Sequence, residues 1–228
     1  TRDDLSRCIA GYYARSETQT ATPQLDLQYL FEQLPLANRA RVRLETYLDR
    51  LWLVKGDGLY TTDDKLGQYI DLARAYGWKR ILMVVDYAQR VPIRADLAHL
   101  GLSESQRIDF IMRACKGFAM KYHIPLIGVA AADEEGIRKE RVHFENLWGG
   151  SMVQYEPDVA LILNRDSLDV GSSVRRIRIA IEKNRHGPSE VEYRHWLHGA
   201  HYGVSTRGEA IVDADSYQRD RIAIRPSP

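Results

Sequence analysis

The sequence of 228 residues lacks several features that mark familiar classes of protein. Its two cysteines, Cys8 and Cys115, are far apart and belong to no CxxC pair, which argues against a disulfide framework or a zinc site. No apolar run approaches the length of a membrane span, and the first residues are charged rather than signal-like. We therefore predict no membrane association and a reducing, cytoplasmic compartment.

Charge of one sign is not in excess. The 32 basic and 31 acidic residues give a formal net charge of +1, so any binding of nucleic acid must come from a local patch. No glycine is followed by lysine, so the phosphate-binding loop GxxxxGKS or GxxxxGKT is absent from these residues, and we expect the chain alone to bind nucleotide poorly or not at all. The chain also opens without an initiator methionine, which suggests an excised piece of a longer protein.

Three apolar runs predict the strands of a sheet. Residues 81–86 (ILMVVD) do not alternate in polarity and end on the carboxylate of Asp86, a pattern typical of a parallel strand buried on both faces. Residues 125–132 and 158–163 form two similar runs. Residues 51–54 are a shorter run that could form a short strand.

Helical spacing of apolar residues predicts the elements between the runs. The predicted helices cover residues 3–15, 25–34, 36–51, 62–76 and 103–122. Gly77 is a typical helix stop, and Ser103 with Gln106 resembles a capping box. Residues 133–150 are polar and predict a loop.

The C-terminal part changes character. Residues 174–182 alternate in polarity, residues 183–188 form a turn, and residues 191–196 alternate again, which predicts an antiparallel hairpin. From about Gly203 the sequence is polar and without periodicity, so we predict a peripheral tail. The whole pattern predicts one α/β domain, with a mainly parallel sheet flanked by helices and a C-terminal antiparallel hairpin.

Two places carry residues suited to nucleotide chemistry. Asp86 either ends a central strand in an ordinary polar turn or holds a Mg²⁺–nucleotide, because ligands bind at the carboxyl edge of open α/β sheets. Lys183 and Arg185 are spaced so that both project from one face of a strand. They could reach a phosphate across a subunit boundary, as an arginine finger does, or they could be ordinary charges of a solvated hairpin tip.

A third candidate is the loop before the last apolar run. Arg138, Lys139 and Arg141 could follow a nucleic-acid backbone, although nearby acids weaken the field and leave a solvated loop as the alternative. The residues that could add backbone amides and a stacking aromatic are Trp148, Gly149, Gly150 and Ser151. Three histidines spaced by three, His195, His198 and His201, fall on a strand end and a loop, so we favour ordinary surface or packing histidines over a metal site.

Taken in order, the motifs resemble a known family. The segments ILMVVDYAQRV, IPLIGVAAADEEG, LWGGSMVQYEPDVALILNRD and IEKNRHGPSEVEYRHW are similar to successive motifs in the RecA-like ATPase domain of DnaB-type replicative helicases. The helix DDKLGQYIDLARAYG and the opening TRDDLSRCIAGYYARSE resemble the family as well. The resemblance implies a RecA-like P-loop NTPase fold over residues 1–205 and a C-terminal tail over residues 206–228.

The resemblance also implies roles for individual residues. Asp86 matches the Walker B aspartate that organises Mg²⁺ and water, and Gln89 matches the polar residue of the family's D-Y-L-Q stretch. Lys183 and Arg185 match the basic pair that a neighbouring subunit contributes to the γ-phosphate. The segment of Gly150 and Ser151, with the loop before it, matches the part that lines the central channel and grips single-stranded DNA.

The chain departs from the family pattern at several positions. The phosphate loop and the catalytic glutamate, which in the family lie just before the position of Thr1, are not in these residues. Ala131 stands where the family usually has a glutamine that senses the nucleotide. The remaining replacements are Trp148 and Gly149 for Arg-Glu in the DNA loop, and Asn184 and His186 for Gln and Asn in the hairpin. This pattern favours a divergent phage- or plasmid-type helicase, or a related DnaB-like ATPase, over a housekeeping helicase.

The resemblance implies that the intact protein is an ATP-dependent DNA helicase and that this fragment alone is inactive. ATP and Mg²⁺ would be its cofactors, both needing the missing phosphate loop for tight binding. Its expected partners are single-stranded DNA, further copies of itself in a hexameric ring, and a primase or helicase loader. Two alternatives remain: a non-catalytic RecA-like module for DNA binding or assembly, and a RecA-like ATPase of the recombinase or clock type.

Overall fold

A computed structural model describes residues 42, 45–47, 49–165, 174–198, 203–205 and 208–211. The chain divides into two compact units, each built from more than one stretch of sequence. One comprises residues 1–54, 161–182 and 188–228, and the other residues 55–160 and 183–187. The helices predicted over residues 3–15 and 25–34 lie outside the described residues, and the predicted domain boundary near residue 205 stays a prediction.

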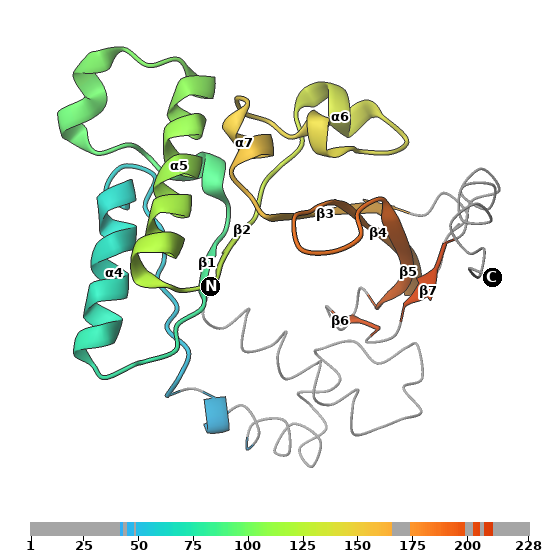
Figure 1. Cartoon of the computed structure of the whole chain (residues 1–228), viewed down its shortest axis with the longest axis horizontal. Coiled ribbons are helices and arrows are strands. Elements are labelled where there is room, and N and C mark those ends of the chain that lie inside the picture. The colour runs from blue at the N-terminus through green and yellow to red at the C-terminus, as the bar shows by residue number, and fades with distance from the viewer. Residues whose placement is uncertain are drawn as a thin grey trace, which may run out of the picture. The chain divides into compact units, whose positions relative to one another are not determined.

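Two long helices dominate the unit of residues 55–160. They are α4 (Asp63–Ala75) and α5 (Glu104–Tyr122), which pack against each other (Figure 1). The predicted capping box at the start of α5 is confirmed, because the Ser103 hydroxyl accepts from the Gln106 amide and the Gln106 side chain accepts from the Ser103 amide. Gly77 follows α4 with a φ of 89°, a backbone conformation that favours glycine.

The two helices cover one face of a small parallel sheet. Strands β1 (Met83–Val85) and β2 (Leu126–Gly128) pair in parallel, within the longer runs predicted from the sequence. Val85 is buried in one cluster with Leu66 of α4 and Ile111 of α5. This cluster forms because the apolar stripes of both helices are directed at the same side of the sheet.

The opposite face of this sheet is exposed. Leu82 and Val84 each keep 56% of their surface accessible, and Ile127 keeps 51%. The prediction that residues 81–86 are buried on both faces is therefore wrong for the described residues. An apolar run shows that both faces avoid polar side chains, but it does not show which segment covers each face.

Short helices occupy the connections. They are η1 (Ala88–Arg90), η2 (Ala95–Leu100), α6 (Glu134–Arg138), η3 (Phe144–Asn146) and α7 (Met152–Tyr155). The irregular loop predicted over residues 133–150 is therefore wrong in part. Asp133 begins α6 by accepting a 2.6 Å hydrogen bond from the Gly136 amide, and a helix of five residues is too short to leave a periodic pattern in the sequence.

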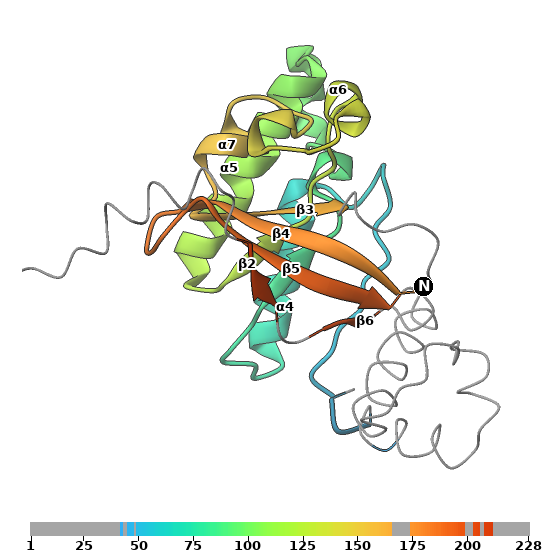
Figure 2. The same cartoon turned by 90° about the vertical axis from the view of Figure 1, so that its right-hand side faces the viewer.

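The remaining strands form a second sheet. They are β3 (Val159–Arg165), β4 (Val174–Asn184), β5 (Val191–His198), β6 (Gly203–Val204) and β7 (Glu209–Ala210). The order is β3-β4-β5-β6, with β7 also paired to β5. Strands β4 and β5 are antiparallel, with Ile181 opposite Val191, which confirms the predicted hairpin (Figure 2).

Two details of the second sheet differ from the sequence prediction. Strand β3 pairs with β4, and its burial alternates, so the prediction that this strand is buried on both faces is wrong. Part of the segment from Gly203 onward, expected to be irregular, pairs with β5 as β6 and β7.

Residues 51–54 form no strand. No helix in the described ranges is long and apolar enough to span a lipid bilayer.

Candidate functional site

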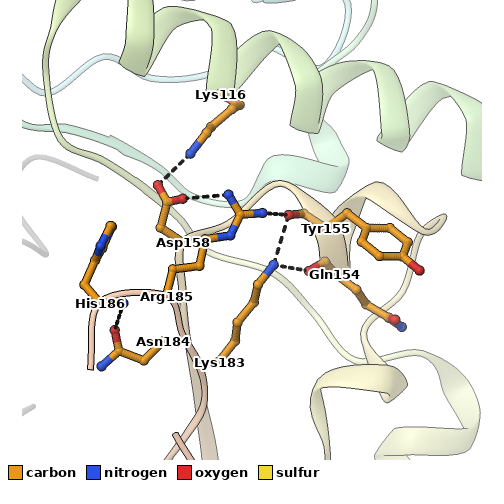
Figure 3. Close-up of polar contacts among 8 residues, drawn as sticks. All are labelled: Lys116, Gln154, Tyr155, Asp158, Lys183, Asn184, Arg185 and His186. Atoms are coloured by element: carbon orange, nitrogen blue, oxygen red, sulfur yellow. Dashed lines mark hydrogen bonds and ion pairs between the residues drawn. The ribbon is translucent and has the colours of Figure 1, made fainter. Parts of the chain in front are cut away.

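The two cations of the hairpin, Lys183 and Arg185, converge on the end of α7 (Figure 3). The Lys183 ammonium donates to the carbonyls of Gln154 at 2.7 Å and Tyr155 at 2.9 Å. The Arg185 guanidinium donates from Nη2 to the same Tyr155 carbonyl at 2.8 Å. Carbonyls in the last turn of a helix have no partner within it, so they accept readily from cations.

A carboxylate completes the cluster. Asp158 accepts from Arg185 Nη1 at 3.1 Å through Oδ1 and from Lys116 Nζ at 2.6 Å through Oδ2 (Figure 3). Its main-chain carbonyl also accepts from the Arg185 amide at 2.9 Å. The hydrogen bond from Lys116, followed by the charges of Lys116 and Arg185, lowers the pKa of Asp158 below its ordinary 3.8.

The cluster keeps a positive balance. Three cations, Lys116, Lys183 and Arg185, outnumber the two nearby carboxylates, those of Asp158, which bonds Lys116 and Arg185, and of Glu156, which acts on Lys183 by its charge. Partial burial, and then the neighbouring Arg185 charge, lower the pKa of Lys183. A guanidinium has five N–H donors and an ammonium has three. Each side chain uses two of its donors in these hydrogen bonds. Among the described residues, Arg185 therefore keeps three donors and Lys183 one for a further ligand. The cluster can therefore receive an anion such as a phosphate.

The local backbone of the hairpin turn is shaped by Asn184. Its side-chain oxygen accepts a 3.1 Å hydrogen bond from the His186 amide. A Cβ atom at Gly187 would lie 2.9 Å from the side-chain nitrogen of Asn184, so a larger residue there would make the Asn184 amide shift. Asn184 and His186, which differ from the residues expected from the resemblance, thus contact each other on either side of Arg185, where β4 ends and the turn begins.

Asp86 lies directly after β1 and is exposed. No hydrogen bond or ion pair of the described residues joins it to Lys183 or Arg185. Mg²⁺ is commonly held by one or two carboxylates together with waters and substrate phosphates, so a single exposed Asp fits the role of one such ligand. The described residues contain no group of three or more His, Cys, Asp or Glu placed to hold a metal by themselves.

Gln89 is only 1% exposed and joins three segments. Its amide nitrogen donates to the carbonyls of Ala131 at 3.1 Å and Trp148 at 3.0 Å, and its oxygen accepts from the Ala131 amide at 3.2 Å. Arg107 of α5 holds the same segment by donating to the Gln89 carbonyl. The side-chain amide of Gln89 contacts only backbone groups of the segment between β2 and α7 in these hydrogen bonds. These contacts give Gln89 a structural role, and its catalytic role stays a prediction.

The loop of Trp148 to Ser151 is held by a residue that the sequence did not mark. Asp109 of α5 accepts a 2.8 Å hydrogen bond from the Met152 amide. A Cβ at Gly150 would lie 2.4 Å from both Asp109 carboxylate oxygens, and a Cβ at Gly149 would lie 2.6 Å from Val153. Both glycines are therefore required by close packing. Asp109 was missed because its partners lie more than 40 residues away, and no local pattern links them.

The basic residues near this loop are largely paired with acids. Arg138 lies 3.9 Å from Glu134, and Lys139 lies 3.0 Å from Glu135, both as i,i+4 pairs. These pairs are exposed and weak, so both cations can exchange their partners for phosphate groups. Of the three spaced histidines, His195 contacts the Ser205 carbonyl at 2.9 Å, and His201 lies outside the described residues.

Comparison with known proteins gives a sequence relative among the helicases. No protein-family model matches the chain. A protein described as replicative DNA helicase DnaB, from Mycoplasma pneumoniae, is 25% identical over 139 residues, which are 57% of this chain and 28% of that protein. The chain thus spans less than a third of the length of this curated relative.

Solved structures give the fold. One, described as an ATPase domain, superimposes with a TM-score of 0.66 at 13% identity, covering 91% of this chain and 71% of that one. A DnaB-like replicative helicase, whose structure was determined with its interactions with primase, gives a TM-score of 0.62 at 16% identity, covering 85% of this chain and 45% of that one. The predicted RecA-like fold is confirmed.

Proposed function

We propose, on the premise that this chain is a RecA-like ATPase domain of the DnaB type, that the intact protein is an ATP-dependent DNA helicase. Its subunits would form a hexameric ring in the cytoplasm of a bacterium. The gene that encodes it would belong to the bacterium, to a phage or to a plasmid. ATP bound between subunits would drive movement along single-stranded DNA. A primase or helicase loader would be a further partner, since one structural relative is described with primase.

The hairpin cluster is the observation that carries this proposal. Lys183 and Arg185 are held side by side at one turn, each with donors left for a phosphate. In phosphoryl transfer, catalysis comes mainly from positioning and from stabilising the charge that develops on the phosphoryl oxygens. The basic pair would supply that stabilisation at the γ-phosphate of a neighbouring subunit.

Asp86 would serve the opposite side of the site. Bound with ATP, Mg²⁺ neutralises phosphate charge and orients the γ-phosphate for attack. The exposed carboxylate of Asp86 would hold the ion directly or through water. Because Asp86 and the basic pair share no contact in the described residues, we assign them to two different interfaces of the ring.

The DNA contact would come from the segment between α6 and α7. The cations Arg138, Lys139 and Arg141 would approach the phosphate backbone. The residues that would follow them along the strand are Trp148, Gly149, Gly150 and Ser151. Gln89 and Asp109 support this segment by binding its backbone, so its amides are held in place for phosphate contacts.

Replacing Arg185 with alanine in the full-length protein tests the proposal. We expect Arg185→Ala to leave nucleotide binding nearly intact and to lower DNA-stimulated ATP turnover by about 10³-fold, the usual effect of losing an arginine finger. Arg113→Ala, on the exposed surface of α5, is the matched control and should keep wild-type turnover. Turnover that survives Arg185→Ala would show that the assignment of this residue is wrong.

A non-catalytic RecA-like module is the second candidate. It is favoured by Ala131 at the sensor position and by the absence of a phosphate loop from these residues. The coding sequence immediately upstream of Thr1 distinguishes the two candidates. A strand, a GxxxxGKS or GxxxxGKT loop, a helix and a strand ending in glutamate would support the helicase. Strand-exchange and unwinding assays would separate it from a recombinase- or clock-type ATPase.

A further inference from the structure

A single carboxylate lies between two cations from distant parts of the sequence. Asp158 bonds Lys116 of α5 on one side and Arg185 of the hairpin on the other (Figure 3). We propose that Asp158 is a positioning residue that fixes the orientation of the Arg185 guanidinium for its phosphate. This inference rests on the proposed function, because it assigns a support to the same basic pair.

The geometry fixes Arg185 at three points. The main-chain carbonyl of Asp158 accepts from the Arg185 amide at 2.9 Å, which sets where the side chain starts. The Asp158 carboxylate and the Tyr155 carbonyl accept from the two terminal nitrogens, at 3.1 Å and 2.8 Å. A planar group held at both ends of one edge cannot rotate freely, so its remaining donors point in a defined direction.

Asp158 is itself fixed to a rigid element. Its second carboxylate oxygen accepts a 2.6 Å hydrogen bond from Lys116, which lies on the 19-residue helix α5. That helix contributes Ile111 and Cys115 to the buried core. The Arg185 side chain is 49% exposed and would otherwise sample many rotamers. The series from Lys116 through Asp158 to Arg185 therefore connects an exposed turn to the core.

The support leaves the cation able to act. Asp158 and Tyr155 together occupy two of the five guanidinium donors, and Lys116 supplies a positive charge that offsets the carboxylate. Lys183 and Arg185 both donate to the Tyr155 carbonyl, so the positive charge of Lys183 lies close to that of Arg185. Asp158 thus orients Arg185 while the cluster stays positive.

The test compares carboxylate variants in the full-length protein. We expect Asp158→Asn to lower kcat about tenfold with little change in KM for ATP, because a misoriented guanidinium is felt in the transition state. Asp158→Glu, which keeps the charge on a longer stem, should recover part of kcat. Asp96→Asn is the matched control, since Asp96 pairs with Arg94 at 3.6 Å on the surface and should leave kcat unchanged.

A double variant separates positioning from stability. If Asp158 acts through Arg185, then adding Asp158→Asn to Arg185→Ala should cause no further loss of kcat. Additive losses, or a loss of kcat matched by unfolding at the assay temperature, would overturn the positioning role. Wild-type kcat in Asp158→Asn with an inactive Arg185→Ala would overturn it too, while leaving the proposed function in place. An active Arg185→Ala would overturn both.

Discussion

At the scale of single residues, Gly150 and Gly117 differ in the space that is available for a side chain. Gly150 faces the Asp109 carboxylate, whose two oxygens would lie 2.4 Å from an added Cβ. Gly117 lies within α5 and has nothing within 4 Å of such an atom. The first glycine is required by its neighbour, and the second only loosens the helix.

Alanine at these two positions should have opposite effects on stability. We expect Gly150→Ala to lower the free energy of unfolding by about 1–3 kcal/mol and, under the proposed function, to weaken single-stranded DNA binding, because the Asp109 carboxylate must move away from the loop. Gly117→Ala should raise the free energy of unfolding by about 0.5–1 kcal/mol, because alanine is a better helix former than glycine. Urea unfolding and a DNA-binding titration would measure both. A Gly150→Ala protein as stable as wild type would contradict the close contact.

At the scale of elements, the turn after β4 is attached to α5 and α7 mainly by charged and polar groups. Lys183 bonds the end of α7, and Arg185 bonds both α7 and Asp158. The hydrogen bond from Lys116 and the charge of Arg185 stabilise the ionised form of Asp158. The attachment of this turn should therefore depend on pH.

The sign of that dependence follows from the lowered pKa of Asp158. A carboxyl with a folded pKa below its ordinary 3.8 stabilises the fold above that value, and the contribution is lost as pH falls through the folded pKa. The difference in unfolding free energy between wild type and Asp158→Asn should therefore shrink as pH falls from about 6 to below 3.8. Lys116→Met, which removes the main cause of the shift, should move this loss to higher pH. A difference that stays constant across this range would contradict the ionised contact.

At the scale of the whole molecule, the proposed Mg²⁺ ligand Asp86 and the proposed phosphate-binding pair Lys183 and Arg185 do not contact each other in the described residues. Asp86 follows β1, and the basic pair lies at the end of β4, with no hydrogen bond or ion pair between them in the described ranges. Under the proposed function, Asp86 of one subunit works with Lys183 and Arg185 of the next. Inactive variants of Asp86 and of the basic pair should then complement each other.

Mixed rings measure this directly. Full-length Asp86→Ala and Arg185→Ala proteins should each be inactive, and together they should regain part of the ATPase activity, because some interfaces then pair an intact Asp86 with an intact Arg185. The control mixes Asp86→Ala with a chain that carries both substitutions, where no interface has both intact residues. If the first mixture were no more active than this control, the two residues would not act across a subunit boundary.

The sequence by itself determined the elements whose signals are local. The periodicity of α4 and α5, the capping box at Ser103 and the alternation of β4 and β5 are set by residues a few positions apart, and all are present in the structure. The ordered motifs likewise indicated the RecA-like fold that the structural relatives confirm. Local hydrogen bonding and side-chain periodicity suffice for such predictions.

Only the tertiary structure decided which distant residues meet. Lys116 is 42 positions from Asp158, and Arg185 is 27 positions from it. No local pattern could therefore indicate that Lys116 and Arg185 both bond the Asp158 carboxylate. The contact of Asp109 with Gly150 and the exposed face of β1 were equally hidden. The sequence shows that an apolar side chain needs a covering surface and that a charged side chain needs an opposite charge or water. Which neighbour supplies it depends on how the elements pack in space.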